Sequence, residues 1–166
     1  MVNGYYKVPS GVYFNGGDFT IMVWIKVRNY NYWSRVIDFG TGPISNMVTL
    51  AVSEITSGYP LISFHSSSGT MSIKSSISLE LNKWKHLTSV FSLNNGFIYI
   101  DGVSYTGSVP SLTVGPINIV RTSNFVGRSN NPGEADVDAD MDELKIFNRA
   151  LSQQAVANEM NNNMFL

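Results

Sequence analysis

Cysteine is absent from the 166-residue chain, so its fold cannot depend on disulfides and no thiol is available as a nucleophile. Charge is also scarce: charged residues make up 14% of the sequence, and the formal net charge is −1. Because no basic cluster occurs, nucleic-acid binding is not expected. No apolar run approaches the roughly 20 residues that span a bilayer. We therefore expect one domain of ordinary size that folds around an apolar core.

Residues for nucleophilic catalysis are equally few. The two histidines are His65 and His86, and the many serines include no Gly-x-Ser-x-Gly motif. An isolated histidine has no partner to orient it, so a structural or surface role is expected for both.

The residues that are plentiful favour strands. Short apolar runs rich in Val, Ile, Tyr and Phe alternate with turn residues. This rhythm predicts strands over residues 12–14, 19–27, 35–39, 48–52, 61–64, 71–77, 84–91, 97–100, 117–120 and 124–128, and a last strand that begins near Met141. One helix is expected over residues 153–160, with Ser152 as its N-cap. Trp24 and Trp84 lie inside strand patterns and are assigned to the core.

Several motifs follow one another in a characteristic order. These are Asp18-Phe19-Thr20-Ile21 with Trp24, then Trp84-x-His86, Tyr99-x-Asp101-Gly102, Val126-Gly127-Arg128, and Asp142-Glu143 leading to Phe147-Asn148-Arg149-Ala150-Leu151-Ser152. In this order they resemble the concanavalin A-like superfamily, specifically its laminin-G-like jelly-roll branch. Ala139-Asp140-Met141 departs from the Gly and aliphatic residue usual before Asp-Glu. The resemblance implies an all-β, two-sheet antiparallel sandwich with one short C-terminal helix. We expect a single domain over residues 1–166, with a core of about 12–160 and a frayed tail at 161–166.

The first seven residues lack an apolar stretch followed by small residues, so they do not read as a signal peptide. Two interpretations stay open: a cytosolic protein, or a piece excised from a larger secreted chain. The resemblance favours the extracellular, excised domain.

An acidic run over residues 134–143 raises the question of a metal. On an extended strand Asp136, Asp138, Asp140 and Asp142 would share one face, and their repulsion would require a countercharge. Calcium could supply it, because it prefers carboxylate and carbonyl oxygens. The alternative is a solvated loop before the last strand. By analogy with related jelly rolls, the Gly16 carbonyl, Asp18 and Asp142 are candidates for a structural Ca²⁺ site, and Asp38, Asp136, Asp138 and Asp140 for a second.

The same run fails as a glycosidase signature. Glu134-x-Asp136 begins like the catalytic motif of sandwich glucanases, but Asp138 and Ala139 stand where the acid/base Glu belongs. No catalytic residues are therefore expected.

The segment after residue 27 carries three large rings. Trp33 is expected to pack under the sandwich, whereas Tyr30 or Tyr32, beside Asn31 and Arg35, could form a sugar-binding platform that Tyr59 joins. Packing and platform remain open alternatives for these tyrosines.

The resulting prediction is a non-catalytic recognition module that binds glycans or glycoproteins through rim loops, with possible help from calcium. The alternative is a structural or adhesive domain that makes protein contacts within a larger extracellular protein, and a divergent glycoside hydrolase is a third reading. Fold alone does not choose among them.

Overall fold

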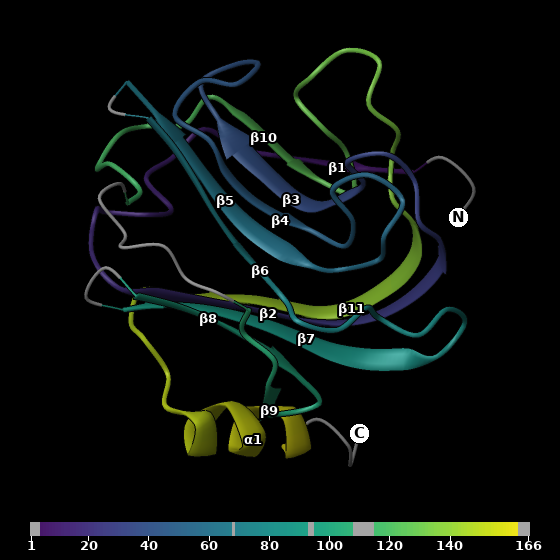
Figure 1. Cartoon of the computed structure of the whole chain (residues 1–166). Helices are drawn as coiled ribbons and strands as arrows, with labels where there is room; N and C mark the ends of the chain where they lie inside the picture. The colour runs from purple at the N-terminus through teal and green to yellow at the C-terminus, as the bar shows by residue number, and fades with distance from the viewer. Residues whose placement is uncertain (1–3, 68, 93–94, 108–114, 163–166) are drawn as a thin grey trace.

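The computed structural model describes residues 4–67, 69–92, 95–107 and 115–162. They form two antiparallel sheets that face each other, with one helix beneath the second sheet (Figure 1). The predicted two-sheet sandwich with a short C-terminal helix is confirmed. In the described part of the chain, no helix is long and apolar enough to cross a membrane.

The strands are shared unequally between the two sheets. The six-stranded sheet has the order β1 (Tyr6–Val8), β10 (Ser123–Val126), β3 (Arg35–Gly40), β4 (Val48–Ala51), β5 (Leu61–Ser66) and β6 (Gly69–Lys74). The five-stranded sheet has the order β11 (Asp138–Phe147), β2 (Phe19–Asn29), β7 (Trp84–Ser92), β8 (Asn95–Ile100) and β9 (Val103–Ser104). The helix, α1, covers Gln153–Asn161.

Apolar side chains from both inner faces meet between the sheets. Along β2 every second residue enters this core, as Ile21, Val23 and Ile25 do, because side chains alternate across a strand. Phe64 of β5 and Phe91 of β7 meet edge to face across the sandwich, with ring centroids 5.2 Å apart. These contacts join the two sheets.

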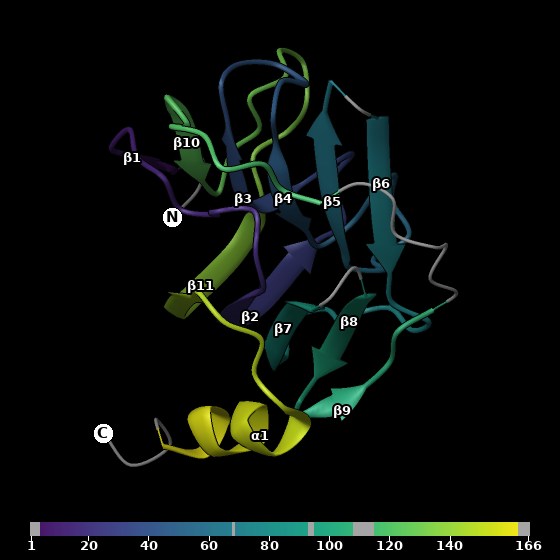
Figure 2. The same cartoon turned by 90° about the vertical axis from the view of Figure 1, so that its left-hand side faces the viewer.

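A second, smaller apolar cluster lies on the outer face of the five-stranded sheet. Met22, Val90 and Tyr99 pack there against Leu151 and Val156, from the end of the chain. The Ser152 side chain caps α1 by accepting a hydrogen bond from the Ala155 amide, at 3.2 Å. Figure 2 shows α1 lying beneath this sheet. The helix therefore covers one end of the outer face.

The core assignment of Trp24 and Trp84 is wrong. Both lie on the outer face of the five-stranded sheet, where Trp24 pairs with His86 and Lys26 pairs with Trp84. Trp84 is 46% exposed. Trp24 is half-buried and packs on the His86 ring, with the two ring centroids 5.2 Å apart. The reason is that β2 carries apolar residues on both faces, with Ile21 and Val23 in the core and Met22 packed in the outer cluster, so its pattern does not show which face is the core.

Several predicted strand bounds also differ. Residues 12–14 and 117–120 are not strands; beside them a single bridge joins Gly11 to Arg121. The buried Arg121 guanidinium donates to the carbonyls of Phe14, Asn46 and Ile117, which replaces regular strand pairing there. The strands β1 and β9 were not predicted. Of the predicted frayed tail, residues 163–166 lie outside the described part.

Truncating one inner and one outer aromatic side chain tests this arrangement. Phe91→Ala should lower the free energy of unfolding by about 3–5 kcal/mol, because Phe91 is buried between the sheets. Trp84→Ala should cost clearly less, since nearly half of that side chain is already in solvent. Urea denaturation of the two variants gives the comparison. Equal losses would contradict the placement of Trp84 on the outer face.

His86 gives the fold a pH dependence. Burial lowers the pKa of His86 to about 4, and the positive charge of Lys145 adds to this, against the opposing charge of Asp101. In the unfolded chain the His86 imidazole binds a proton below about pH 6.5, whereas in the folded chain it does so only below about pH 4. The free energy of unfolding therefore falls as the pH drops from about 6.5 toward 4. We expect His86 to account for a loss of about 2 kcal/mol between pH 7.5 and 5, measured by urea denaturation. His86→Gln should remove that part of the pH dependence; an unchanged dependence would contradict the assignment.

Candidate functional site

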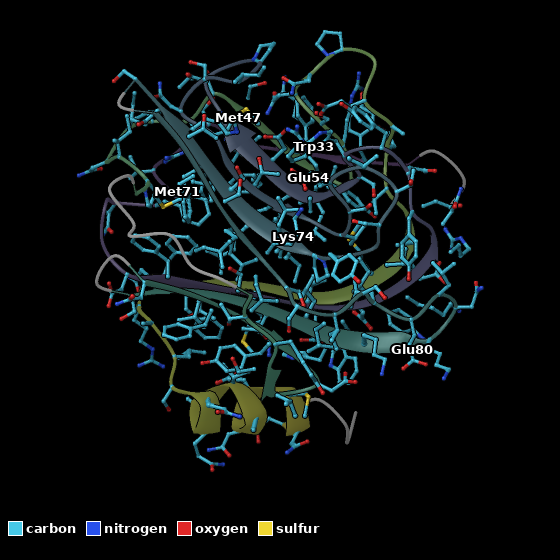
Figure 3. All side chains as sticks on the ribbon, in the orientation of Figure 1. Trp33, Met47, Glu54, Met71, Lys74 and Glu80 are labelled. Atoms are coloured by element: carbon cyan, nitrogen blue, oxygen red, sulfur yellow. The ribbon has the colours of Figure 1, made fainter. Side chains whose placement is uncertain are left out.

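A cavity of about 190 Å³ opens on the outer face of the six-stranded sheet, the face turned away from α1. We call it the outer-face cavity; the residues that line it are Trp33, Arg35, Ile44, Met47, Thr49, Ser63, His65, Asn131 and Glu134. Figure 3 shows Trp33 and Met47 with this sheet, and Glu80 near the other one. The cavity is thus built from three strands and the loops that follow β2, β3 and β10.

The short polar side chains of Thr49 and Ser63 form the floor of the cavity, and the buried Asp38 lies beside Thr49. Asp38, Thr49 and Ser63 lie opposite one another on β3, β4 and β5, on the outer face, because their neighbours on each strand point into the core. Thr49 donates a hydrogen bond to Asp38, at 3.3 Å. Since Thr and Ser are short, they leave room above the sheet between taller walls.

One wall is Trp33. Its backbone is in the left-handed region, with φ of 49°, and its amide donates to the Glu54 carbonyl at 3.2 Å. This conformation is uncommon for a bulky residue and holds the ring at the edge of the cavity. The Arg35 guanidinium lies 5.5 Å from the centre of the Trp33 ring, within the range of a cation–π contact.

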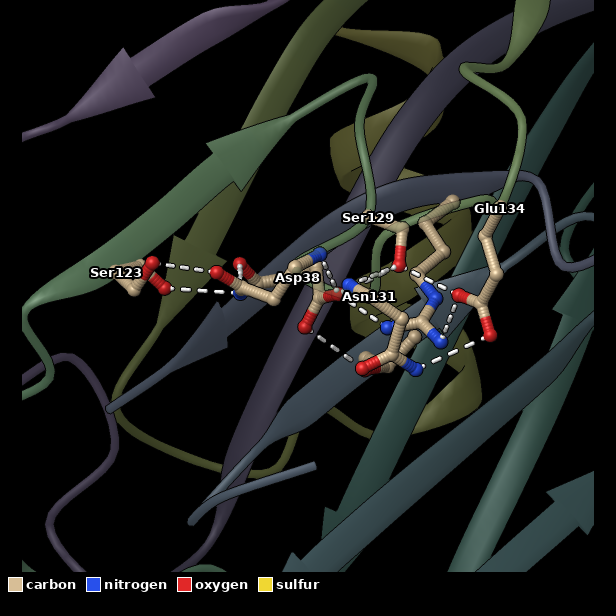
Figure 4. Close-up of polar contacts among 8 residues, drawn as sticks. Asp38, Ser123, Ser129, Asn131 and Glu134 are labelled. Atoms are coloured by element: carbon tan, nitrogen blue, oxygen red, sulfur yellow. Dashed lines mark hydrogen bonds and ion pairs between the residues drawn. The ribbon is translucent and has the colours of Figure 1, made fainter. Parts of the chain in front are cut away.

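A buried ion cluster forms the adjoining wall, in contact with Trp33 through Arg35 (Figure 4). Arg35 is 3% exposed, and its guanidinium binds Asp38 through one terminal nitrogen and Glu134 through the other. Glu134 also accepts hydrogen bonds from the side chains of Ser129 and Asn131. Asp38 is fully buried and accepts from the Asn130 amide at 2.8 Å. The cluster therefore fastens the loop after β10 to strand β3.

Two polar atoms of the cavity lining lack a partner. Within the described residues, Arg35 Nε and Asn131 Oδ1 are buried and make no hydrogen bond. Such groups are costly when left unsatisfied. One is a donor and the other an acceptor, so a ligand that carries hydroxyl groups could satisfy both.

His65 lies at the rim, with its Nδ1 3.0 Å from the Thr70 hydroxyl. Burial lowers the pKa of His65, the Arg35 charge lowers it further, and the carboxylates Asp38 and Glu134 oppose the shift. The imidazole is therefore neutral near pH 7 and can both donate and accept a hydrogen bond.

Of the predicted sugar-binding residues, the structure places Arg35 in this cavity and the others elsewhere. Tyr30 is half-buried; its hydroxyl donates to the Leu79 carbonyl and its ring packs closely on Gly58. Asn31 donates to the backbone of Asp136. Tyr32 and Tyr59 are 53% and 38% exposed but do not line the cavity. Tyr30 thus packs as Trp33 was expected to, and Trp33 lines the site.

The predicted calcium ligands do not converge. Gly16 and Asp18 precede β2, whereas Asp142 pairs with Trp24, six residues further along that strand, which is roughly 20 Å away. Asp18 accepts a hydrogen bond from Ser92. These residues do not fit one ion.

The second predicted set is equally divided. Asp38 belongs to the buried ion cluster, and Asp136 lies in the loop ahead of β11. Asp138 and Asp140 lie on β11 and pair with Arg28, and Asp140 also pairs with Lys26 at 3.2 Å. Among the described residues, no group of three or more His, Cys, Asp or Glu side chains is placed to hold a metal ion. Calcium stays a prediction from the resemblance.

Most of the cavity lining was not singled out from the sequence. The signal for Thr49, Ser63 and His65 was present as polar residues that alternate with apolar ones in two strand patterns. The pattern does not show that β4 pairs with β5, and this pairing places Thr49 beside Ser63. Asn131 and Glu134 come from a loop, where no periodicity applies.

A larger groove lies at the open edge of the sandwich. We call it the edge groove; it has a volume of about 420 Å³ and lies between β1 and β11. Half of its lining residues are aliphatic, and three others are acidic. The aliphatic residues are Val126, Val137, Ala139, Met141 and Leu144, and the acidic ones are Asp140, Asp142 and Glu143. It lacks the buried ion cluster that characterises the outer-face cavity.

The comparisons with known proteins agree with this architecture. A laminin-G-type model of the concanavalin A-like lectin/glucanases superfamily matches residues 1–157, and the chain therefore belongs to that superfamily. No curated protein sequence matches the chain closely enough to count as a relative.

Solved structures of low sequence identity share the fold. Domain 4 of AbnA, a GH43 extracellular arabinanase from Geobacillus stearothermophilus, was solved with arabinotriose; it has a TM-score of 0.75 and 17% identity over 92% of this chain and 70% of that one. A Trypanosoma rangeli sialidase in complex with 2,3-difluorosialic acid has a TM-score of 0.62 and 16% identity over 90% of this chain and 23% of that one. A structure of botulinum neurotoxin type C, from work on its interaction with two ganglioside molecules, has a TM-score of 0.63 and 20% identity. The match covers 88% of this chain and 36% of that one. The chain thus spans a small part of the last two.

Removing Arg35 tests the buried ion cluster. Arg35→Ala leaves Asp38 and Glu134 without their cation, so the free energy of unfolding should fall by about 3–5 kcal/mol in urea denaturation. Lys83→Ala, which breaks an exposed ion pair with Glu80, is the matched control and should leave stability nearly unchanged. A loss no larger than that of the control would mean that the cluster does not hold the loop.

Proposed function

We propose that the chain is a non-catalytic carbohydrate-binding module and that the outer-face cavity is its binding site. The observation that carries the proposal is the Trp33 ring beside a cluster of buried polar groups. A sugar ring has apolar C–H faces that pack on an aromatic side chain, and hydroxyl groups at its edge that need donors and acceptors. The similar arabinanase domain, solved with arabinotriose, supports the choice of ligand class.

The state of the carboxylates favours binding over hydrolysis. A glycosidase needs one carboxyl group as acid and a second as nucleophile or base. In the outer-face cavity, Asp38 and Glu134 are both bound to Arg35, and Asp38 is fully buried. Neither group is free to attack a sugar or to protonate a leaving group, so we infer that the site binds without converting its ligand.

The size of the cavity indicates which part of a glycan it takes. Its volume of about 190 Å³ is below the roughly 300 Å³ of a pocket for a drug-sized ligand. One sugar ring is therefore the expected occupant, and we propose recognition of a chain end or branch. The rest of the glycan would extend past the rim residues Ile44 and His65.

The proposal includes the setting of the domain. We propose that it works outside the cell, within a longer chain that positions it on a glycan. Support comes from the matched structures, since two of those chains are several times longer than the part that matches. The arabinanase is described as extracellular.

A second candidate function rests on the edge groove. Its aliphatic residues and its position beside the edge strand β11 suit an extended peptide better than a sugar, and the acidic residues of its lining favour a peptide that carries basic side chains. This would make the chain a structural or adhesive module that contacts other proteins. The absence of a buried polar group among the groove residues separates this site from the outer-face cavity, within the part of the chain that the structure describes.

Replacing Trp33 tests the proposed function. Trp33→Ala should weaken binding to a neutral oligosaccharide, arabinotriose first and a glycan array next, by about tenfold, because the ring provides the stacking surface. Tyr32→Ala removes an exposed ring outside the cavity and is the matched control. Calorimetric titration gives the affinities, and a thermal melt checks that both variants fold. Equal loss in the two variants would contradict the location of the site.

A further inference from the structure

We propose that the outer-face cavity selects uncharged sugars and excludes sugars that carry a carboxylate, such as uronic and sialic acids. The inference rests on the proposed function and adds the class of ligand. It comes from the charges that line the cavity.

The cavity has no cation available for an acidic sugar. Among the described residues that line it, Arg35 is the one cation, and both of its terminal nitrogens are bound to carboxylates. Arg35, Asp38 and Glu134 together carry a formal charge of −1. His65 adds none near neutral pH, because burial and the Arg35 charge lower its pKa. A carboxylate brought into this site meets net repulsion. Because the cavity opens to solvent and the Glu134 side chain is 14% exposed, added salt screens part of that repulsion.

Two cations outside the cavity contact other residues. Lys74, on the outer face of β6, is paired with Glu54. Arg128, in the loop after β10, lies over the Tyr5 ring, 4.4 Å from its centre. Neither residue lines the cavity, so neither offers a free positive charge to a ligand there.

Arg35 Nε offers an acidic sugar a single N–H. A paired contact of the sugar carboxylate with the terminal nitrogens would require displacing Asp38 or Glu134, and the structure opposes this. Asp38 is fully buried and holds the Asn130 amide and the Thr49 hydroxyl in addition to Arg35. Glu134 is held by Ser129 and Asn131. Displacing either one would leave a buried carboxylate unpaired, which is strongly unfavourable.

Hydroxyl groups suit the same surroundings. The lining is rich in acceptors, with the Glu134 carboxylate and the unpartnered Asn131 Oδ1. A hydroxyl can donate to these atoms and accept from Arg35 Nε, whereas an ionised carboxylate can only accept. The charge of the cavity and the hydrogen-bonding groups of its lining therefore both favour uncharged sugars with hydroxyl groups.

Matched pairs of sugars test the inference. Each pair has a neutral hexose oligomer and the uronic acid oligomer with the same linkage, so that the two differ only in CH₂OH against COO⁻ at C6. Calorimetric titration or an array at low salt should show the acidic member bound at least about tenfold more weakly than the neutral one. The difference should shrink as salt is raised to about 0.5 M, because screening reduces the repulsion.

Two variants locate the effect. Glu134→Gln keeps the shape of the side chain and removes one negative charge from the cavity, so the preference for neutral sugars should narrow severalfold. Glu80→Gln changes the net charge of the protein equally at an exposed position far from the cavity and should leave the preference as it is. If Glu134→Gln fails to fold in a thermal melt, the salt series on the natural chain decides the question.

The possible outcomes distinguish the exclusion of acidic sugars from carbohydrate binding itself. Equal or tighter binding of the acidic members would overturn the inference and leave the carbohydrate-binding function intact. Binding of no sugar from either set at millimolar concentration would overturn the proposed function, and the inference with it. Neutral binding with a salt-sensitive exclusion of the acidic members would support both.

Discussion

The contact of one buried guanidinium with two carboxylates determines the shape of the outer-face cavity. Arg35, a residue of β3, binds Asp38 of the same strand and Glu134 of the loop after β10, and also lies over the Trp33 ring. Both walls of the cavity therefore depend on one side chain. A buried ion pair seldom stabilises a fold more than apolar packing would, so its value here lies in fixing geometry and charge at a site.

In the five-stranded sheet, acidic side chains pair with cations on a neighbouring strand at partly exposed positions. Its acidic strand β11 carries Asp138 and Asp140, and the sequence indicated that such a row of like charges needs a countercharge. The neighbouring strand β2 supplies it through Lys26 and Arg28. These pairs are partly exposed, so they contribute little stability. What they do is place two cations beside the carboxylates of an acidic strand at the edge of the sheet.

Period-two patterns predicted most strand positions and, together with the family resemblance, the sandwich, whereas the Ser152 cap and apolar residues at helical spacing predicted the single helix. The strand patterns failed where a strand is apolar on both faces, so that Trp24 and Trp84, which lie on the outer face, read as core residues. They also failed for the site, where only Arg35 was anticipated. The cavity depends on strand register, which places Thr49 beside Ser63, and on a loop that carries Asn131 and Glu134. Neither property is periodic in the sequence.

The central claim is that sugars bind in the outer-face cavity, and an NMR titration tests it most directly. On addition of a neutral oligosaccharide such as arabinotriose, the account predicts that the Trp33 indole N–H and the Arg35 Nε–H signals shift, while the indole signal of Trp84 stays in place. Shifts confined to Trp84, or to the edge-groove residues Met141 and Leu144, would place binding on another surface and contradict the account.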